Sequence, residues 1–363
     1  MVKNGIKTMN KQIRIADKII GENNPPFIIA EMSGNHNRSL ERALEIVEEA
    51  AKAGADAIKI QTYTADTMTL DINDGEFFIA DEKSLWKGIS LYKLYETAHT
   101  PWDWHKAIFD KAAKCGIIAF SSPFDETAVD FLEELNAPCY KIASFECADV
   151  TLIKKVAVTG KPVIISTGMA SEEEVKDAVD AFKQAGGKDL ILLKCTSAYP
   201  ATAADANLNT IPDMRKKYSV QVGLSDHTHG IGVPVAATVL GATVIEKHFT
   251  LKRSDGGVDS AFSLEPNELK SLVVETKKAW QSLGRVQYGV SENEKNNTVF
   301  RRSIYVSKDI KEGDRFSEDN IRRIRPGYGL APKYYEQIIG KTAASNLKKG
   351  KPLSFEDIKD KIA

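Results

Sequence analysis

Two histidines in the second half of the chain, His227 and His248, have the residue type and surroundings to bind a metal ion. Each follows a short apolar run, residues 218–222 and 242–245, of the kind that forms a buried strand. The apolar segment 231–240 between them is long enough for one helix, and a strand–helix–strand unit brings two parallel strand ends side by side. We therefore expect both histidines to converge on one divalent metal ion, because neutral imidazole is a common ligand. The alternative is that each only forms a hydrogen bond at its strand end.

Two lysines in apolar surroundings, Lys59 in AIKIQ and Lys141 in CYKIA, indicate an anionic ligand. Burying a lysine is unfavourable unless it has an ion-pair partner or a ligand. Polar side chains also follow nearly every predicted strand, and they are Glu31, Ser33, Asn35, His36, Gln61, Ser121, Ser122, Ser144, Glu146, Ser166, Thr167, Lys194, Thr196, Ser197, Tyr199, Ser225, Asp226, Glu246 and Lys247. Lysines and hydroxyls together suit a phosphate-bearing substrate. Structural ion pairs and Schiff-base chemistry at a lysine are the alternatives, and the metal ligands argue against the second.

The elements that position these residues alternate regularly. Short apolar strands are predicted at 27–31, 56–61, 117–120, 139–143, 163–166, 190–194, 218–222 and 242–245, each followed by a helical pattern. This order over about 280 residues predicts an α/β fold of the (β/α)8 barrel type. A doubly wound open sheet is the alternative, but it would gather polar residues at one switch point instead of after nearly every strand. A short hairpin at about 12–20 is expected to plug the bottom of the barrel.

The chain is predicted to contain two domains, at 1–284 and 300–363, joined by a polar linker at 285–299. The second domain contains an internal repeat, in which IKEGDRFSEDNI (310–321) matches LKKGKPLSFEDI (347–358). In each copy a glycine suits a left-handed turn and a serine suits the cap of a short helical turn.

Composition narrows the class of protein. The formal net charge of the 363 residues is −1, which gives no electrostatic case for binding nucleic acid or an anionic membrane. No apolar run approaches the roughly 20 residues of a membrane span, and the N-terminus lacks the apolar core of a secretory signal. The four cysteines are scattered, which favours cytoplasmic thiols over disulfides or a zinc site. Neither a dinucleotide-binding nor a Walker motif is present.

Seven segments resemble the sialic acid synthase family in order and spacing: FIIAEMSGNHN (27–37), IKIQT (58–62), FSSPF (120–124), YKIASFE (140–146), STGM (166–169), GLSDHT (223–228) and EKHF (246–249). Residues 310–341, including IRPG at 324–327, resemble the antifreeze-like SAF domain that ends proteins of this family. The resemblance implies condensation of phosphoenolpyruvate with an open-chain acetamido sugar, with C–O cleavage and release of phosphate. It also implies a divalent metal cofactor, Mn²⁺ or Mg²⁺, held by His227 and His248.

The resemblance assigns roles to individual residues. The phosphoenolpyruvate contacts it implies are Lys59, Ser122, Lys141, Ser144, Ser166, Ser197 and Ser225. Glu31 and Glu146 would position water, stabilise a cationic intermediate or carry a proton. The sugar contacts it implies are Gln61, Tyr199, Asp259 and Arg325. Arg325 would reach into the partner subunit, so that the enzyme would be a homodimer with exchanged SAF domains.

Within the family, EMSGNHN and YTADTMTLD (63–71) are similar to the pseudaminic acid synthase subfamily. Two positions depart from the usual family pattern, since Ser197 replaces an asparagine and Val258 replaces the proline of Gly-Pro-Asp. The alternatives are synthesis of N-acetylneuraminate or legionaminic acid and, more remotely, a protein that only binds carbohydrate or ice. We expect the insertion at 62–99 to decide the sugar, with an apolar patch for a 6-deoxy sugar drawn from Met68, Phe77, Phe78 and Trp86.

Overall fold

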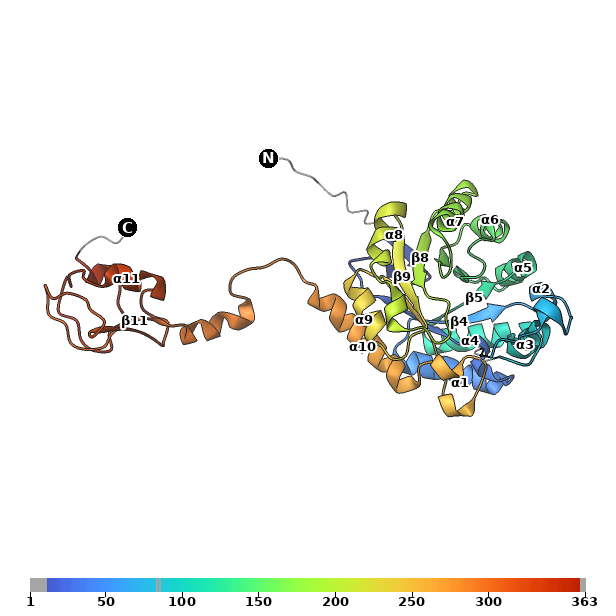
Figure 1. Cartoon of the computed structure of the whole chain (residues 1–363), viewed down its shortest axis with the longest axis horizontal. Helices are drawn as coiled ribbons and strands as arrows, with labels where there is room; N and C mark the ends of the chain where they lie inside the picture. The colour runs from blue at the N-terminus through green and yellow to red at the C-terminus, as the bar shows by residue number, and fades with distance from the viewer. Residues whose placement is uncertain (1–11, 83, 85, 360–363) are drawn as a thin grey trace. The chain divides into compact units, whose positions relative to one another are not determined.

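The computed structural model of the chain describes residues 12–82, 84 and 86–359. The chain divides into two compact units, one ending at Gly284 and the other beginning at Arg285 (Figure 1). None of the helices in the described ranges is long and apolar enough to cross a membrane.

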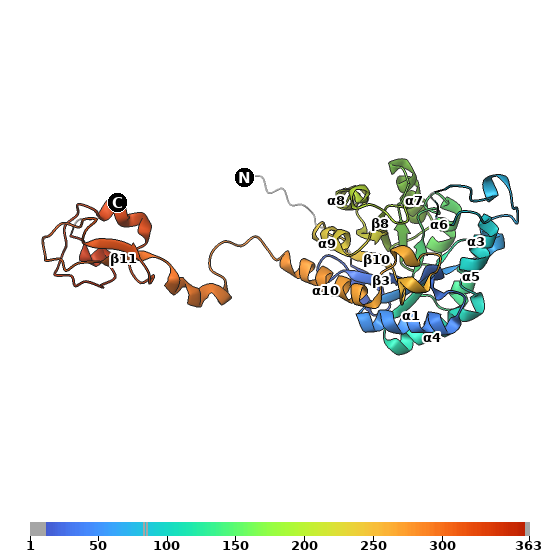
Figure 2. The ribbon, with the colours of Figure 1, turned by 60° about the horizontal axis from the view of Figure 1, so that its bottom comes forward.

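The first unit is a closed barrel of eight parallel strands, and the predicted (β/α)8 fold is confirmed (Figures 1 and 2). In order around the barrel the strands are β10 (Val244–His248), β3 (Phe27–Glu31), β4 (Ala57–Thr62), β5 (Ile118–Pro123), β6 (Tyr140–Ile142), β7 (Val163–Ser166), β8 (Leu190–Cys195) and β9 (Gln221–Asp226). Pairing of β10 with β3, in which Val244 faces Phe27 and His248 faces Glu31, closes the barrel. This closure rules out the open-sheet alternative.

Two strands extend further than the apolar runs predicted. β9 begins at Gln221 instead of 218 and continues through Asp226, and β10 continues through His248. The expectation that the polar segments begin past these strands is therefore wrong for Ser225, Asp226 and the stretch 246–248. Side chains alternate between the inside and outside of a barrel strand, so polar residues can continue a strand wherever one side holds a polar site.

Helices surround the barrel, and α1 (Leu40–Ala53) packs against both α4 (His105–Cys115) and α10 (Pro266–Ser282). The remaining connecting helices are α5 (Glu126–Glu134), α6 (Val150–Ala157), α7 (Glu172–Gln184), α8 (Thr210–Tyr218) and α9 (Gly232–Val239). Local sequence fixes their ends. Ser39 caps α1 and Gly54 stops it in a left-handed conformation, and Ser171 and Glu174 form a capping box at the start of α7.

A hairpin of β1 (Ile13–Ile15) and β2 (Lys18–Ile20) closes one end of the barrel. Its Ile13, Ile15 and Ile20 join the same buried cluster as the inward-facing Phe27, Phe120 and other apolar residues of the strands. The polar site must therefore lie toward the other, C-terminal end of the strands.

A long insertion separates β4 from α4. It contains two helices, α2 (Ala65–Met68) and α3 (Leu91–Ala98), and the 3-10 turns η2 (Gly75–Phe77) and η3 (Trp102–Trp104). Between α2 and α3, Phe78 and Ser90 form an antiparallel bridge, and backbone hydrogen bonds join Ile79 to Gly88 and Ile89.

The second unit has a small core and a two-stranded sheet of β11 (Ser303–Val306) and β12 (Ile321–Ile324). It also contains η7 (Glu292–Phe300) and α11 (Tyr335–Ile338). The internal repeat is structural, because equivalent apolar positions from both copies are buried in one cluster: Ile310 with Leu347, Phe316 with Leu353, and Ile321 with Ile358. The first of these pairs forms an antiparallel bridge. The repeat therefore supplies both halves of one core.

Candidate active site

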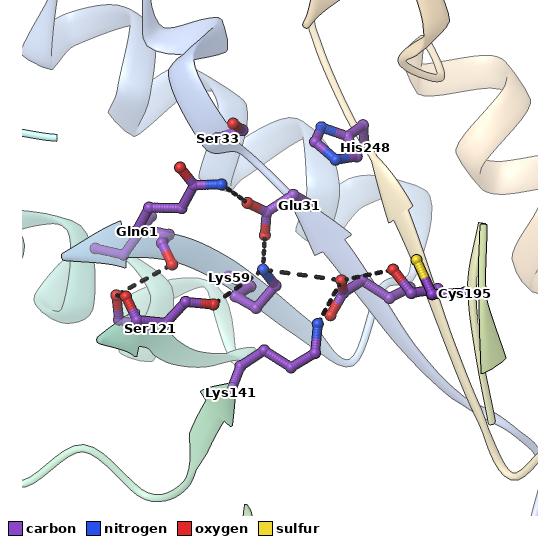
Figure 3. Close-up of polar contacts among 12 residues, drawn as sticks. Glu31, Ser33, Lys59, Gln61, Ser121, Lys141, Cys195 and His248 are labelled. Atoms are coloured by element: carbon purple, nitrogen blue, oxygen red, sulfur yellow. Dashed lines mark hydrogen bonds and ion pairs between the residues drawn. The ribbon is translucent and has the colours of Figure 1, made fainter. Parts of the chain in front are cut away.

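Four buried charged side chains form an ion-pair network inside the barrel (Figure 3). Lys59 Nζ of β4 lies 2.6 Å from Glu31 Oε2 of β3 and 3.8 Å from Glu246 Oε1 of β10. Lys141 Nζ of β6 lies 3.0 Å from the same Glu246 oxygen, to which Ser225 Oγ also donates at 3.1 Å. The four charged side chains are between 1% and 5% exposed. Two lysines thus share one carboxylate in an interior where an isolated charge would be strongly unfavourable.

Burial and neighbouring charges act in opposite directions on this network. Burial raises the pKa of Glu31 despite the adjacent Lys59 ammonium. For Glu246, the two ammonium groups of Lys141 and Lys59 outweigh burial and lower the pKa to about 2. Burial lowers the pKa of Lys141, whereas Glu246 and Glu31 outweigh burial at Lys59 and raise its pKa. Glu246 is therefore the ionised centre of the network and keeps both lysines in place.

Four polar atoms near the network are buried and have no hydrogen-bond partner among the described residues. They are Glu146 Oε2, Ser166 Oγ, Glu246 Oε2 and His248 Nδ1. Native interiors satisfy nearly all buried polar groups, so such exceptions need an explanation. These atoms belong to β7, to β10 and to the turn after β6, which meet at the C-terminal end of the barrel. A polar ligand bound at this end would satisfy them.

Serines from neighbouring strand ends surround a glycine. The Gly168 backbone N–H donates to Ser144 Oγ at 3.2 Å. A Cβ atom at Gly168 would clash with Ser197 Oγ and lie 2.8 Å from Ser144 Oγ. Only glycine therefore lets these two hydroxyls approach the turn after β7. Ser122 lies on the other side of the network, where it accepts from Lys59 Nζ at 3.3 Å.

The two predicted metal-binding histidines lie side by side, with ring centroids 5.2 Å apart. His227 Nδ1 is 2.9 Å from the backbone oxygen of Thr196, which can only accept, so Nδ1 carries a proton and Nε2 is the atom left to bind a metal ion. Burial lowers the pKa of His248 well below its usual value, which keeps this ring neutral, whereas Cys195 and the Thr196 carbonyl outweigh burial at His227 and raise its pKa. His248 Nδ1 lies 3.8 Å from Asp259 Oδ2, and Asp259 in turn accepts from Ser33 Oγ.

This donor set fits a divalent metal ion with few protein ligands. Two adjacent imidazoles are available, and one buried imidazole nitrogen of His248 has no hydrogen-bond partner among the described residues. Within residues 12–82, 84 and 86–359, no cluster of three or more histidine, cysteine, aspartate or glutamate side chains has the geometry of a metal site. A cation held by the two histidines would therefore keep open positions for water and substrate.

The residues expected to contact the sugar fall into two groups. Gln61 donates to Glu31 Oε1 at 3.1 Å, and the Tyr199 ring lies 4.5 Å from the His227 ring, so both adjoin the network or the histidines. Asp259 is near His248, as described above. Arg325 belongs to the second unit, where it is an exposed residue just after β12. Of the residues to which the resemblance assigns a role, all except Arg325 belong to the barrel unit.

Comparison with known proteins agrees with this geometry. Residues 46–288 match the NeuB family, and residues 301–359 match the SAF domain. The chain belongs to the NeuB family. It is 47% identical over 333 residues to a pseudaminic acid synthase of Campylobacter jejuni, covering 92% of this chain and 96% of the relative. It is 44% identical over 335 residues to a pseudaminic acid synthase of Helicobacter pylori, covering 92% and 98%.

A solved structure shares the fold of this NeuB-family chain. The N-acetylneuraminic acid synthetase of Leptospira borgpetersenii, in complex with citrate, is 35% identical and superposes with a TM-score of 0.70. The match covers 79% of this chain and 95% of that one. The expected membership of the sialic acid synthase family, with a C-terminal SAF domain, is confirmed.

The sequence analysis did not identify the roles of several residues at this site. Glu246 was placed near the histidines but not recognised as the partner of both lysines. The alternation of side chains along a strand could have indicated this role, because Glu246 pairs with Ser225 and lies two residues before His248, on the same face of the strand. Gly168 lies in the STGM segment, which the sequence analysis singled out. Its close contact with two serine hydroxyls could not be predicted, because those serines lie on loops distant in sequence. Phe262, whose ring lies 4.9 Å from the His248 ring, had none.

Proposed function

We propose that this chain is a pseudaminic acid synthase. It condenses phosphoenolpyruvate with 2,4-diacetamido-2,4,6-trideoxy-L-altrose and water to give pseudaminic acid and phosphate. One observation carries this proposal: a buried two-lysine network lies beside a pair of buried histidines, in a chain 47% and 44% identical to two pseudaminic acid synthases. Identity to the N-acetylneuraminic acid synthetase, at 35%, is lower.

Phosphoenolpyruvate binds at the lysine network. Lys59 and Lys141 neutralise its carboxylate and phosphate, and the hydroxyls of Ser122, Ser144, Ser166, Ser197 and Ser225 donate hydrogen bonds to its oxygens. In the absence of substrate, Glu246 and Glu31 hold the lysines in position. The ordering of the two side chains is thus complete before the ligand arrives, which favours tight and oriented binding.

The acceptor sugar lies over the histidine pair, with its aldehyde toward the enol carbon of phosphoenolpyruvate. A divalent metal ion, Mn²⁺ or Mg²⁺, held by His227 and His248 would polarise the aldehyde oxygen as a Lewis acid. Asp259 and Gln61 orient the sugar hydroxyls or acetamido groups, and Tyr199 packs against its chain. Closeness of these residues to the two histidines supports this placement.

The reaction forms one C–C bond and one C–O bond and breaks one C–O bond. C3 of phosphoenolpyruvate bonds to the aldehyde carbon, whose oxygen takes up a proton and becomes a hydroxyl, a water oxygen adds at C2, and phosphate leaves with the bridging oxygen. Glu146 accepts the proton of the attacking water, because burial raises its pKa to about 7 and matches it to this exchange at neutral pH. Glu31 remains beside Lys59 and stabilises positive charge that develops at C2.

The active form is a homodimer in which Arg325 from one subunit's SAF domain completes the sugar site of the other. Exposure of Arg325 in its own unit is compatible with this role. All four cysteines are free thiols, which supports a cytoplasmic enzyme. If Arg325→Ala left the KM for the sugar unchanged, the intersubunit contact would be disproved.

Phosphate release tests the function directly. The protein is mixed with phosphoenolpyruvate, Mn²⁺ and one of three acceptors: the trideoxy-L-altrose derivative, N-acetylmannosamine or a 2,4-diacetamido mannose derivative. We expect release with the altrose derivative alone, and loss of release after EDTA. Turnover with N-acetylmannosamine would make the chain an N-acetylneuraminate synthase, and turnover with the mannose derivative would make it a legionaminic acid synthase. Release with none of them would favour a carbohydrate-binding protein.

A further inference from the structure

An aromatic wall runs alongside the histidine pair. The Tyr199 ring lies 4.5 Å from His227, the Phe262 ring lies 4.9 Å from His248, and these two aromatic rings are 5.4 Å apart. Trp86 extends the wall, because its ring centroid lies 6.1 Å from that of Tyr199. The wall therefore begins at the proposed metal ligands and ends at a residue of the long insertion between β4 and α4.

The Trp86 side chain is fixed by a contact distant in sequence. Its indole Nε1 donates to the backbone oxygen of Val258 at 3.0 Å. Val258 itself packs closely on the turn that follows β3, since a Cβ atom at Gly34 would clash with the Val258 side chain. The next residue is Asp259, which adjoins His248. Trp86 is thus anchored to the loop that carries a site residue, and its ring is held in one orientation.

The fixed indole has a defined chemical preference. Its single N–H donor is used by Val258, and an indole has no acceptor, so the remaining ring surface offers a ligand only apolar contact. A methyl group gains from such a contact. A hydroxyl in the same place would lose its hydrogen bonds with water and gain none, which is unfavourable.

We propose that Trp86 is a specificity-determining residue that contacts the C6 methyl group of the acceptor sugar. This inference rests on the proposed function, which places the sugar aldehyde at the histidine pair. The aldehyde is C1, so the opposite end of the open chain points away from the histidines, along Tyr199 and toward Trp86. The insertion therefore selects a 6-deoxy sugar over its 6-hydroxy counterpart.

The experiment compares kcat/KM for two acceptors that differ only at C6: 2,4-diacetamido-2,4,6-trideoxy-L-altrose and 2,4-diacetamido-2,4-dideoxy-L-altrose. Wild type should prefer the 6-deoxy sugar. Trp86→Ala should lower kcat/KM for the 6-deoxy sugar about tenfold or more, and change that for the 6-hydroxy sugar less than threefold, with the KM for phosphoenolpyruvate unchanged. Trp86→Phe keeps an apolar ring but loses the bond to Val258, and it should retain most of the preference. Ile89→Ala removes an exposed apolar side chain of the same insertion and should change neither value.

Each outcome decides between the possibilities. An equal loss with both sugars in Trp86→Ala would show a purely structural role, and an unchanged ratio would show no role; either result overturns the inference. If Trp86→Phe lost the preference for the 6-deoxy sugar as fully as Trp86→Ala, the effect would come from the hydrogen bond to Val258. That result would also overturn the inference. Failure of wild type to release phosphate with either sugar would instead overturn the proposed function.

Discussion

Lys247 and Asp226 form an ion pair that is almost completely buried, with Lys247 Nζ 2.8 Å from Asp226 Oδ2 and side-chain exposures of 0% and 3%. Each residue directly precedes one of the two site histidines, His227 and His248. Because side chains alternate along a strand, the pair points to the opposite face of the sheet from Glu246. Lys247 also donates to the backbone oxygen of Thr228, and Asp226 accepts from the Thr228 hydroxyl. The pair thus fixes the backbone on both sides of His227 relative to β10.

Removing one member of this pair should destabilise the protein and loosen the histidine site. Lys247→Met leaves the Asp226 carboxylate buried and unpaired, and we expect a loss of about 3–5 kcal/mol in the free energy of unfolding. Asp226→Asn combined with Lys247→Met removes both charges and should recover most of that stability. Urea unfolding of the three proteins measures this. Mn²⁺ affinity, measured by electron paramagnetic resonance without substrates, should stay reduced in the double variant, because Thr228 has lost its anchor. Full recovery of affinity would show that the ion pair has no part in positioning the histidines.

The unpartnered hydroxyl of Ser166 gives a second prediction. Ser166→Ala removes no hydrogen bond of the described structure, so the free energy of unfolding should be unchanged or slightly higher. The KM for phosphoenolpyruvate should rise about tenfold or more, as expected for a lost hydrogen bond to a charged ligand. Ser225→Ala is the matched control, because Ser225 already donates to Glu246, and it should reduce stability as well as affinity. A stability loss in Ser166→Ala equal to that in Ser225→Ala would contradict the ligand-binding interpretation.

Crowding at Gly168 gives a third prediction. Gly168→Ala places a methyl group against Ser144 and Ser197, so both hydroxyls must move away from the turn after β7. We expect the KM for phosphoenolpyruvate to rise by about tenfold or more, while far-UV circular dichroism stays unchanged. Gly232→Ala is the control, because a Cβ atom there meets no atom within 4 Å, and its activity should equal that of wild type. Wild-type kinetics in Gly168→Ala would show that these serines do not contact the substrate.

The sequence predicted the parts of this molecule that depend on local pattern. Short apolar runs and amphipathic helices indicated the barrel, and lysines in apolar strands indicated the buried network. Features that depend on strand register or on contacts between distant loops could not be predicted from local sequence. The partnership of Glu246 with both lysines depends on which strand faces which, and the contact of Trp86 with Val258 joins residues 172 positions apart. The predicted ends of β9 and β10 were too early, because Ser225 and His248 are polar residues that nevertheless lie within these strands.

Glu146 gives the last prediction, which separates stability from activity. Burial raises its pKa from 4.5 to about 7, so between pH 4.5 and 7 the folded state holds a proton that the unfolded state has released. Stability from this group is therefore complete below pH 4.5 and is lost as the pH rises toward 7. Glu146→Gln mimics the protonated form. At pH 8 it should be more stable than wild type by on the order of 2 kcal/mol, a value reduced for partial solvent exposure, and at pH 4 the two should match.

The same substitution should abolish most of the activity. In wild type, kcat/KM should rise as the pH increases through about 7, because the ionised carboxylate accepts the proton of the attacking water. Glu146→Gln should lower kcat by 10²-fold or more, an order of magnitude typical of a lost general base, and the rise near pH 7 should disappear. Urea unfolding at pH 4 and 8, with phosphate release between pH 5.5 and 9, measures both effects. A variant that gains stability but keeps wild-type kcat would show that Glu146 is buried for another reason and moves no proton in the reaction.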